Sequence, residues 1–301
     1  MSTRLQGRGV LVTGASSGIG RELARELGRR GARLAIAARR GELLEALAEE
    51  LTAGGAQRPS VHIADLAERG AAARLAAEVQ DSLGTVDVLV NNAGGGVGGS
   101  QWRVGDRNEG RDAFELNFWS PLALTSALVP GMLERGGGAV VNVTSLAQIG
   151  TWPGMGHYSA TKAALGVATE ALRLELIDSG VQVLEVIPGP VDTAIQGESR
   201  LVPGFQAATR RMPMGDAAEL ARLVVRALER GQPRVVYPRL LGLGYRYPGI
   251  TRRATIRMAR RHVDPSFRSD ERVVRSGSFG DEEARQARAE WERTREALAR
   301  R

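Results

Sequence analysis

Short apolar runs alternate with amphipathic segments along the first two thirds of the chain. In the runs within residues 8–13 and 138–146, consecutive residues are apolar, so both faces of a strand would be apolar. This is typical of parallel sheets that helices cover on both faces. Between the two runs, Ile19, Leu23 and Leu27 recur at four-residue spacing, which places them on one face of a helix. The alternation predicts an α/β fold: a single doubly wound, parallel sheet of the Rossmann type, with helices on both faces.

The same patterns predict where the elements lie up to residue 191. We expect strands over residues 8–13, 32–40, 61–66, 86–94, 138–146 and 181–191. We expect helices over residues 21–31, 41–55, 68–84, 111–138 and 157–180. Residues 1–230 show no fixed-period repeat and are predicted to form one dinucleotide-binding and catalytic domain.

The segment TGASSGIG, residues 13–20, joins the first predicted strand to the first predicted helix. Glycines at such a turn let the chain reverse, let the backbone approach a pyrophosphate, and let the helix pack closely on the strand. The N-terminus of the helix adds unpaired N–H groups and the positive end of its dipole. The alternative is a plain strand-to-helix turn. We expect a dinucleotide site that uses Gly14, Ser16, Ser17, Gly18, Ile19 and Gly20.

The end of the second predicted strand bears on the choice of cofactor. An acidic residue there would bind the ribose 2′-hydroxyl of NAD, whereas a basic residue would accept the 2′-phosphate of NADP. The chain reads Ala37-Ala38-Arg39-Arg40, and the Arg39 guanidinium can bind a phosphate with two hydrogen bonds. Two arginines in a solvated loop are the alternative. We expect NADP(H) to be preferred and NAD(H) to be accepted as well.

Tyr158 and Lys162 stand four residues apart near the start of a predicted helix, and therefore on one face. Lys162 is the only lysine among 41 basic residues, in a chain that otherwise uses arginine. A free tyrosine has a pKa of about 10, and a neighbouring ammonium favours the phenolate. The pair is therefore predicted to act as a general acid–base near neutral pH. A tyrosine packed on a lysine stem is the structural alternative.

Three polar segments end the fourth, fifth and sixth predicted strands: residues 91–94 (NNAG), Ser145, and residues 188–193 (PGPVDT). Ligands of doubly wound sheets bind at the carboxyl ends of strands, so these segments face the predicted cofactor site. Each also has a structural alternative, because Asn, Gly and Ser favour turns and caps.

In this order, TGASSGIG, NNAG, Asn117, Ser145, YSATK and PGPVDT make the chain resemble the short-chain dehydrogenase/reductase (SDR) family over residues 5–230. The resemblance implies that Tyr158 is the acid–base, that Ser145 anchors the substrate oxygen, and that Lys162 binds the ribose and lowers the tyrosine pKa. It also implies that Asn117 holds a water in a proton relay. Further cofactor contacts are implied at Asp65, Leu66, Asn92, Ala93, Gly94, Pro188, Gly189, Val191 and Thr193.

Two segments depart from the family pattern. The loop that follows NNAG, up to residue 110, is long and rich in glycine, and we expect a flexible wall on the substrate side. Residues 194–214 are expected to form a substrate lid. Leu146, Ala147, Ile149, Trp152 and Met155 suggest an apolar pocket.

Residues 231–301 form a predicted Arg-rich C-terminal extension. Residues 231–280 hold 11 arginines and three acidic residues, while residues 281–301 read as a solvated charged helix. We favour a cover over the substrate site or a subunit contact. The alternatives are peripheral contact with an anionic membrane surface and, less favoured, nucleic-acid binding.

The function predicted from the sequence is NAD(P)-dependent hydride transfer between nicotinamide and a carbonyl or alcohol carbon, with NADPH-linked reduction of an apolar ketone or aldehyde favoured. A non-catalytic nucleotide sensor on the same fold is the alternative. The chain has no cysteine, and we expect no metal site and a cytoplasmic homo-oligomer, dimer or tetramer. We see no secretion signal and no run long enough to span a membrane.

Overall fold

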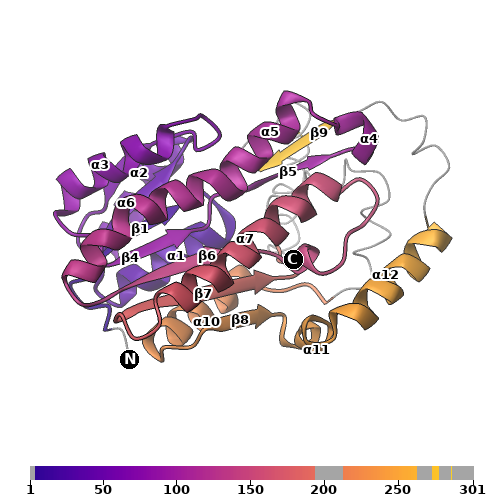
Figure 1. Ribbon diagram of the computed structural model, residues 1–301. Helices are drawn as coiled ribbons and strands as arrows, with labels where there is room; N and C mark the ends of the chain where they lie inside the picture. The colour runs from indigo at the N-terminus through magenta and orange to yellow at the C-terminus, as the bar shows by residue number, and fades with distance from the viewer. Residues whose placement is uncertain (1–3, 194–212, 263–272, 278–285, 287–301) are drawn as a thin grey trace, which may run out of the picture.

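The structure is a computed structural model, and it describes residues 4–193, 213–262, 273–277 and 286. Seven strands form one sheet in the order β3-β2-β1-β4-β6-β7-β8, and every neighbouring pair is parallel (Figure 1). The strands are β1 (Gly9–Thr13), β2 (Arg33–Ala38), β3 (Ser60–Ile63), β4 (Val88–Asn91), β6 (Gly138–Val143), β7 (Val181–Pro188) and β8 (Arg234–Tyr237). The predicted doubly wound fold is confirmed.

Helices cover both faces of this sheet, as the apolar strands require. One face carries α1 (Gly18–Arg29), α2 (Gly41–Ala53) and α10 (Ala217–Glu229), and the other carries α3 (Ala71–Leu83), α6 (Ser120–Glu134) and α7 (Gly156–Glu175). Leu23 and Leu220 are buried in the first layer, and Leu75 and Leu124 in the second. Each fully buried leucine contributes about 1.5–3 kcal/mol, so the two layers hold the sheet rigidly.

The helix predicted over residues 111–138 consists of three consecutive segments. These are α5 (Asn108–Phe114), the π-helix η1 (Glu115–Trp119) and α6. A π-helical turn accommodates an extra residue without leaving the helical path, and such turns are frequent at functional sites. Here it contains Asn117, which is fully buried.

The Gly-rich loop after residue 94 forms regular structure. Its first residues are β5 (Gly95–Gly98), which pairs antiparallel with β9 (Val274–Gly277) from the C-terminal part of the chain. The short α4 (Gln101–Val104) follows it. The expectation of a flexible wall at this point is wrong for residues 95–98, because backbone hydrogen bonds to a distant segment fix them as a strand.

The sheet extends beyond the predicted boundary at residue 230. β8 follows that residue and is the outermost strand, bonded to β7, so part of the predicted extension belongs to the layered body. After β8 the chain forms η3 (Arg239–Leu241), α11 (Gly242–Arg246) and α12 (Pro248–His262), at the right-hand end of Figure 1.

Most of the predicted lid, residues 194–212, lies outside the described residues, as does the charged helix expected over residues 281–301 apart from residue 286. Within the part of the chain that the structure describes, no helix combines the length and the apolar character that crossing a bilayer requires.

Candidate active site

The carboxyl ends of the parallel strands converge on a cavity of about 390 Å³. Most of the side chains predicted to bind cofactor or substrate line it: Gly14, Ser16, Ser17, Gly18, Ile19, Arg39, Asp65, Leu66, Asn92, Ala93, Gly94, Ser145, Tyr158, Lys162, Pro188, Gly189 and Thr193. Gly20, Asn117 and Val191 do not. Val191 is a buried core residue that forms an isolated bridge with Gly215.

The Gly loop and the NNAG segment fit tightly against each other. Gly14 has a φ of +68°, and a Cβ there would lie 2.8 Å from Ala93 Cα. A Cβ at Gly20 would lie 2.4 Å from the Asn92 side-chain nitrogen, which itself donates a 2.9 Å hydrogen bond to the Thr13 carbonyl. Gly20 therefore permits this packing from outside the cavity, whereas Gly14 shapes the cradle itself.

The predicted phosphate side of the cavity holds both arginines that follow β2. Arg39 lies 3.6 Å from the Asp65 carboxylate, and Arg40 donates to Ser16 Oγ at 3.0 Å and to Ser17 Oγ at 2.8 Å. The sequence pattern singled out Arg39 and left Arg40 without a role. The structure brings Arg40 to the Gly loop, because a guanidinium at the start of α2 reaches across the carboxyl edge of the sheet.

Tyr158 and Ser145 line the same cavity, close enough for the Ser145 hydroxyl to act on the pKa of Tyr158. Tyr158 lies in the first turn of α7, and Ser145 is the second residue after the end of β6. Ser145 Oγ also accepts a 3.2 Å hydrogen bond from the Ala147 N–H and so caps η2 (Leu146–Gln148). The cap holds the Ser145 side chain in place, so its structural and its proposed catalytic roles are compatible.

Burial dominates the electrostatics of this pair and of Lys162. It raises the pKa of Tyr158 above its ordinary value of 10.0, and the hydrogen bond from Ser145 opposes that rise. Burial also lowers the pKa of Lys162 from 10.5 to about 8. Lys162 Nζ donates a 2.9 Å hydrogen bond to the Val143 carbonyl. From the sequence we expect a lowered pKa for Tyr158, but this lowering is not found in the protein without its cofactor.

Asn117 is held entirely by protein groups. Its side-chain nitrogen donates to the Gly95 carbonyl at 2.7 Å and to Thr161 Oγ1 at 3.2 Å, and its oxygen accepts from the Gly95 N–H at 3.2 Å. A Cβ at Gly94 would lie 3.0 Å from that oxygen and 3.3 Å from Lys162 Nζ. Asn117 thus fixes the start of β5 beside the lysine, while its relay role stays a prediction.

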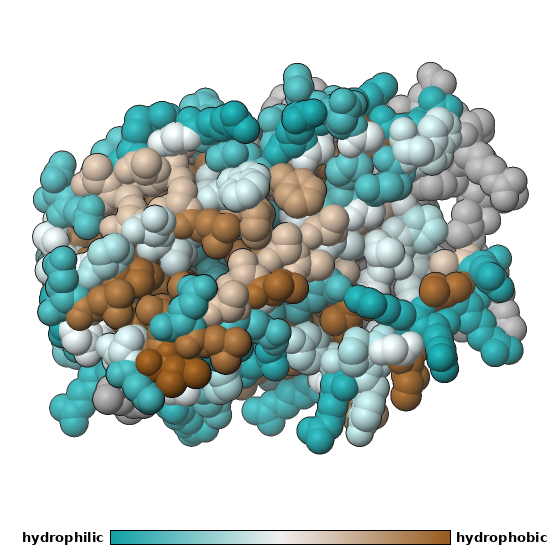
Figure 2. All heavy atoms as spheres, in the orientation of Figure 1, coloured by the Kyte–Doolittle hydropathy of each residue, from teal (hydrophilic) through white to brown (hydrophobic). Residues whose placement is uncertain are grey.

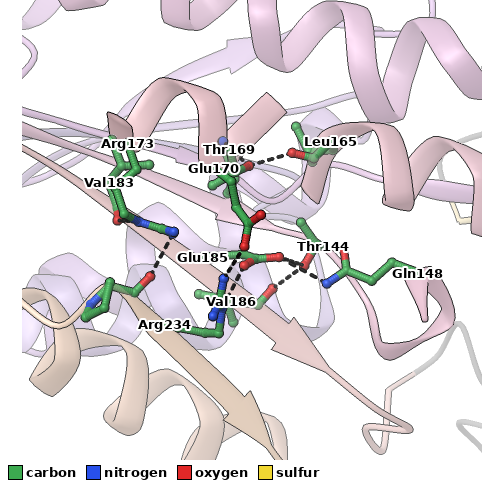
Figure 3. Close-up of polar contacts among 12 residues, drawn as sticks. Thr144, Gln148, Leu165, Thr169, Glu170, Arg173, Val183, Glu185, Val186 and Arg234 are labelled. Atoms are coloured by element: carbon green, nitrogen blue, oxygen red, sulfur yellow. Dashed lines mark hydrogen bonds and ion pairs between the residues drawn. The ribbon is translucent and has the colours of Figure 1, made fainter. Parts of the chain in front are cut away.

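A buried carboxylate that the sequence analysis missed positions the loop carrying Ser145 (Figure 3). Glu185, in β7, is 1% exposed. Thr144 Oγ1 donates to it at 3.2 Å and Gln148 Nε2 at 3.1 Å, so residues on both sides of Ser145 bind the same carboxylate oxygen. The available signal was a single acidic residue inside the otherwise apolar run VLEVI.

Arg234 neutralises Glu185 from the neighbouring strand. Its Nε donates to the other carboxylate oxygen at 2.9 Å, and a second nitrogen donates to Glu170 on α7 at 2.7 Å. The guanidinium also lies 5.0 Å from the centroid of the Tyr245 ring. Since a buried charge is stable only when paired and hydrogen-bonded, β8 is needed to hold Glu185 below the Ser145 loop.

The far end of the cavity is apolar. Leu146, Ala147, Ile149, Trp152 and Met155, which the sequence suggested, all line it. The opposite wall comes from the C-terminal segment, where Leu241, Gly244, Thr251, Thr255 and Met258 line the same cavity. The polar hydroxyls of Ser145 and Tyr158 therefore open onto an apolar chamber whose wall α11 and α12 complete.

The pKa of Lys162 predicts how stability depends on pH. Below pH 8 both the folded and the unfolded chain carry the lysine proton, and the fold bears a buried ammonium. Between pH 8 and 10.5 the unfolded chain binds more protons, so the free energy of unfolding rises with pH. Relative to a Lys162→Met variant, the wild-type chain should gain up to about 3 kcal/mol over this range.

Urea unfolding of both proteins at pH 7 and at pH 10.5, without added cofactor, measures this gain. The variant is its own control, because other titrating groups are shared. A stability difference that stays constant with pH would contradict a depressed lysine pKa.

Comparisons with known proteins agree with this geometry. Residues 8–202 match the model of the short chain dehydrogenase family. A 1-deoxy-11-beta-hydroxypentalenate dehydrogenase of Streptomyces exfoliatus is 40% identical over 197 residues, which span 64% of this chain and 71% of that protein. A short-chain dehydrogenase/reductase of Burkholderia phymatum, solved with NAD, superposes with a TM-score of 0.73 at 25% identity and covers 87% of this chain and 99% of that one.

A short-chain dehydrogenase of Sphingobium yanoikuyae, solved with NADPH, superposes with a TM-score of 0.70 at 27% identity, over 83% of this chain and 95% of that one. The family match spans more than half of the chain and contains the Gly loop, NNAG, Ser145, Tyr158 and Lys162. This protein belongs to the short-chain dehydrogenase/reductase family and is an oxidoreductase.

Proposed function

We propose that this protein reduces an apolar ketone or aldehyde with NADPH, with Tyr158 as the proton donor. The observation that carries the proposal is that Ser145, Tyr158 and Lys162 line one cavity at the carboxyl edge of the sheet. A bound nicotinamide would supply the hydride to the carbonyl carbon. The same geometry serves alcohol oxidation in reverse.

The side chains have distinct tasks in this proposal. Ser145 donates a hydrogen bond to the carbonyl oxygen and aligns it with the Tyr158 hydroxyl. As a carbon–hydrogen bond forms, the π electrons of the carbonyl move to oxygen, which takes the Tyr158 proton. The protonated Lys162 stabilises the resulting phenolate, and the positive charge of the oxidised cofactor favours that phenolate further. Burial raises the pKa of Tyr158, so the phenol carries its proton before the cofactor is bound.

The cofactor cradle supports a dinucleotide. Gly14 leaves the backbone open at the Gly loop, where a Cβ would clash with Ala93. We assign the 2′-phosphate to Ser16, Ser17 and Arg40, with Arg39 beside them, and the adenine to Asp65 and Leu66. The nicotinamide half would lie along NNAG and along Pro188, Gly189 and Thr193, whereas the buried Val191 supports this segment from the core. The solved relatives hold NAD in one case and NADPH in another.

The apolar chamber supports the choice of substrate class. Trp152, Met155, Leu241 and Met258 all line the cavity that also holds the Ser145 and Tyr158 hydroxyls. The Streptomyces relative is named as a dehydrogenase of a pentalenate. A non-catalytic nucleotide sensor is less well supported, because it would not require the acid–base pair or the chamber beyond it.

Replacing Tyr158 by Phe should lower kcat/KM for carbonyl reduction by about 100- to 10,000-fold, since a general acid typically contributes that much. The loss is measured by NADPH oxidation over a panel of apolar ketones and aldehydes. Tyr245→Phe, which removes a hydroxyl outside the cavity, is the control and should retain activity. Unchanged turnover in the Tyr158 variant would refute the assigned role.

Cofactor choice should change in two variants. Arg40→Ala removes a guanidinium held by the Gly-loop serines, and Arg39→Asp places an acid at the ribose. Each should lower kcat/KM for NADPH by about 10- to 100-fold, as expected for a lost charged hydrogen bond, and leave that for NADH equal or higher. Steady-state rates with both cofactors test this. An unchanged NADPH/NADH ratio in both variants would overturn the preference.

We also propose that the protein is a homo-oligomer. Exposed large hydrophobic side chains lie on α6, α7 and their ends: Trp119, Leu133, Val167, Leu174 and Ile177. Figure 2 shows brown and tan spheres over these helices, with teal ones among them. Contiguous apolar surface of this kind marks an interaction site in a folded protein. A second copy is the occupant that the family resemblance favours.

Leu174→Glu should convert the oligomer to monomers, because a carboxylate would be buried without a partner at the interface. Light scattering after gel filtration reports the mass. Leu43→Glu, a matched change on α2 at the opposite face of the sheet, should leave the mass as in the wild type. Equal masses for the wild type and the Leu174 variant would exclude this face as the interface.

A further inference from the structure

The segment from η3 to α12 exposes large apolar side chains that nothing in the proposed reaction uses. Leu240 is 78% exposed, Leu243 68%, Ile250 67% and Ile256 57%. In Figure 2, brown spheres lie singly among teal ones over α11 and α12. Leu240, Leu243, Ile250 and Ile256 thus place four exposed aliphatic side chains within 17 residues of the chain.

The same segment has an extreme charge. Residues 231–262 hold eight arginines and no acidic residue. Arg234 is taken up by Glu185, and Arg252 donates to the Ile149 carbonyl. The others among the described side chains include Arg239, Arg246, Arg253, Arg257 and Arg260, and all five are exposed.

Helix α12 separates these features onto two sides. Ile250, Arg253, Ile256 and Arg260 recur at three- and four-residue spacing and share one exposed side, which Arg257 joins. Thr251, Thr255 and Met258 line the cavity from the other side. We define the outer face as the side formed by Ile250, Arg253, Ile256, Arg257 and Arg260, together with Leu240 and Leu243.

We propose that the outer face binds the surface of an anionic lipid bilayer. The arginines would pair with lipid phosphates, and the isoleucines and leucines would enter the boundary between headgroups and acyl chains. This combination of a basic and an apolar set on one helix is what interfacial helices use. Each basic residue near an anionic membrane surface contributes about 1 kcal/mol.

Other occupants fit the outer face less well. A nucleic-acid backbone would pair with the arginines but would leave the exposed Ile250 and Ile256 side chains without an apolar partner. A second copy of this face would bring Arg253, Arg257 and Arg260 against their own like charges. Of these three occupants, the anionic bilayer satisfies both the charge and the apolar side chains.

Membrane contact by the outer face would also define the substrate class, and this part of the inference rests on the proposed function. The side of α12 opposite the outer face is a wall of the apolar chamber, so membrane contact would bring the chamber to the lipid boundary. The substrate would then be a carbonyl compound that partitions into lipid, such as a long-chain or polycyclic ketone or aldehyde.

The test is co-sedimentation of the full chain with phosphatidylcholine vesicles, with and without phosphatidylglycerol. We expect binding only to the vesicles that contain phosphatidylglycerol. The triple variant Arg253→Glu/Arg257→Glu/Arg260→Glu should bind at least about 100-fold more weakly, as loss of three such contributions implies. Ile250→Ser/Ile256→Ser should also weaken binding. Arg222→Glu/Arg226→Glu on α10 is the matched charge control and should bind like the wild type.

The assay needs neither cofactor nor substrate, so a failure of the proposed reaction would not affect it. The outer-face variants should keep wild-type turnover of a water-soluble carbonyl compound, which also shows that they fold. Three results would overturn the proposal: no binding to phosphatidylglycerol vesicles, equal binding by both outer-face variants, or loss of duplex DNA binding or of oligomer mass in these variants with vesicle binding unchanged.

Discussion

A single ammonium group kept out of water is the constraint around which the site is built. Lys162 is buried and bonded to the Val143 carbonyl, and burial lowers its pKa to about 8. Space for it exists because residue 94 is glycine, and Asn117 holds the next backbone segment from the other side. Arginine would be too large and too rigidly charged for this place, which accounts for the one lysine in an arginine-rich chain.

The parts of the fold that follow from local pattern were predictable. Apolar runs, turn glycines and helical spacing located the strands of the seven-stranded sheet up to β7 and the segments that end them, but not β5. The resemblance assigned roles to Ser145 and Tyr158. Contacts between segments that are distant in sequence could not be predicted, because no short sequence pattern encodes them. β8 was not predicted, because it lies in an Arg-rich segment. The sequence alone also could not show that Arg40 reaches the Gly loop.

The chemistry and the substrate wall come from different parts of the chain. The Ser145 and Tyr158 hydroxyls, which we propose act on the substrate, depend on β6, α7 and the buried Glu185, which binds Thr144 and Gln148 from β7. The chamber wall depends on η3, α11 and α12. Arg234 joins the two, since it neutralises Glu185 and lies over the Tyr245 ring. Substrate range can thus vary in the C-terminal segment while the hydride-transfer geometry is retained.

The pairing of β5 with β9 has a consequence for how the molecule forms. The strands of the dinucleotide half are joined through nearby helices, whereas β9 meets β5 from the other end of the sequence. Long-range pairings carry a large loop-closure entropy and are slow to form. We therefore expect the nucleotide site to form early during synthesis, with the strand at residues 95–98 completed only after residues 274–277 have left the ribosome.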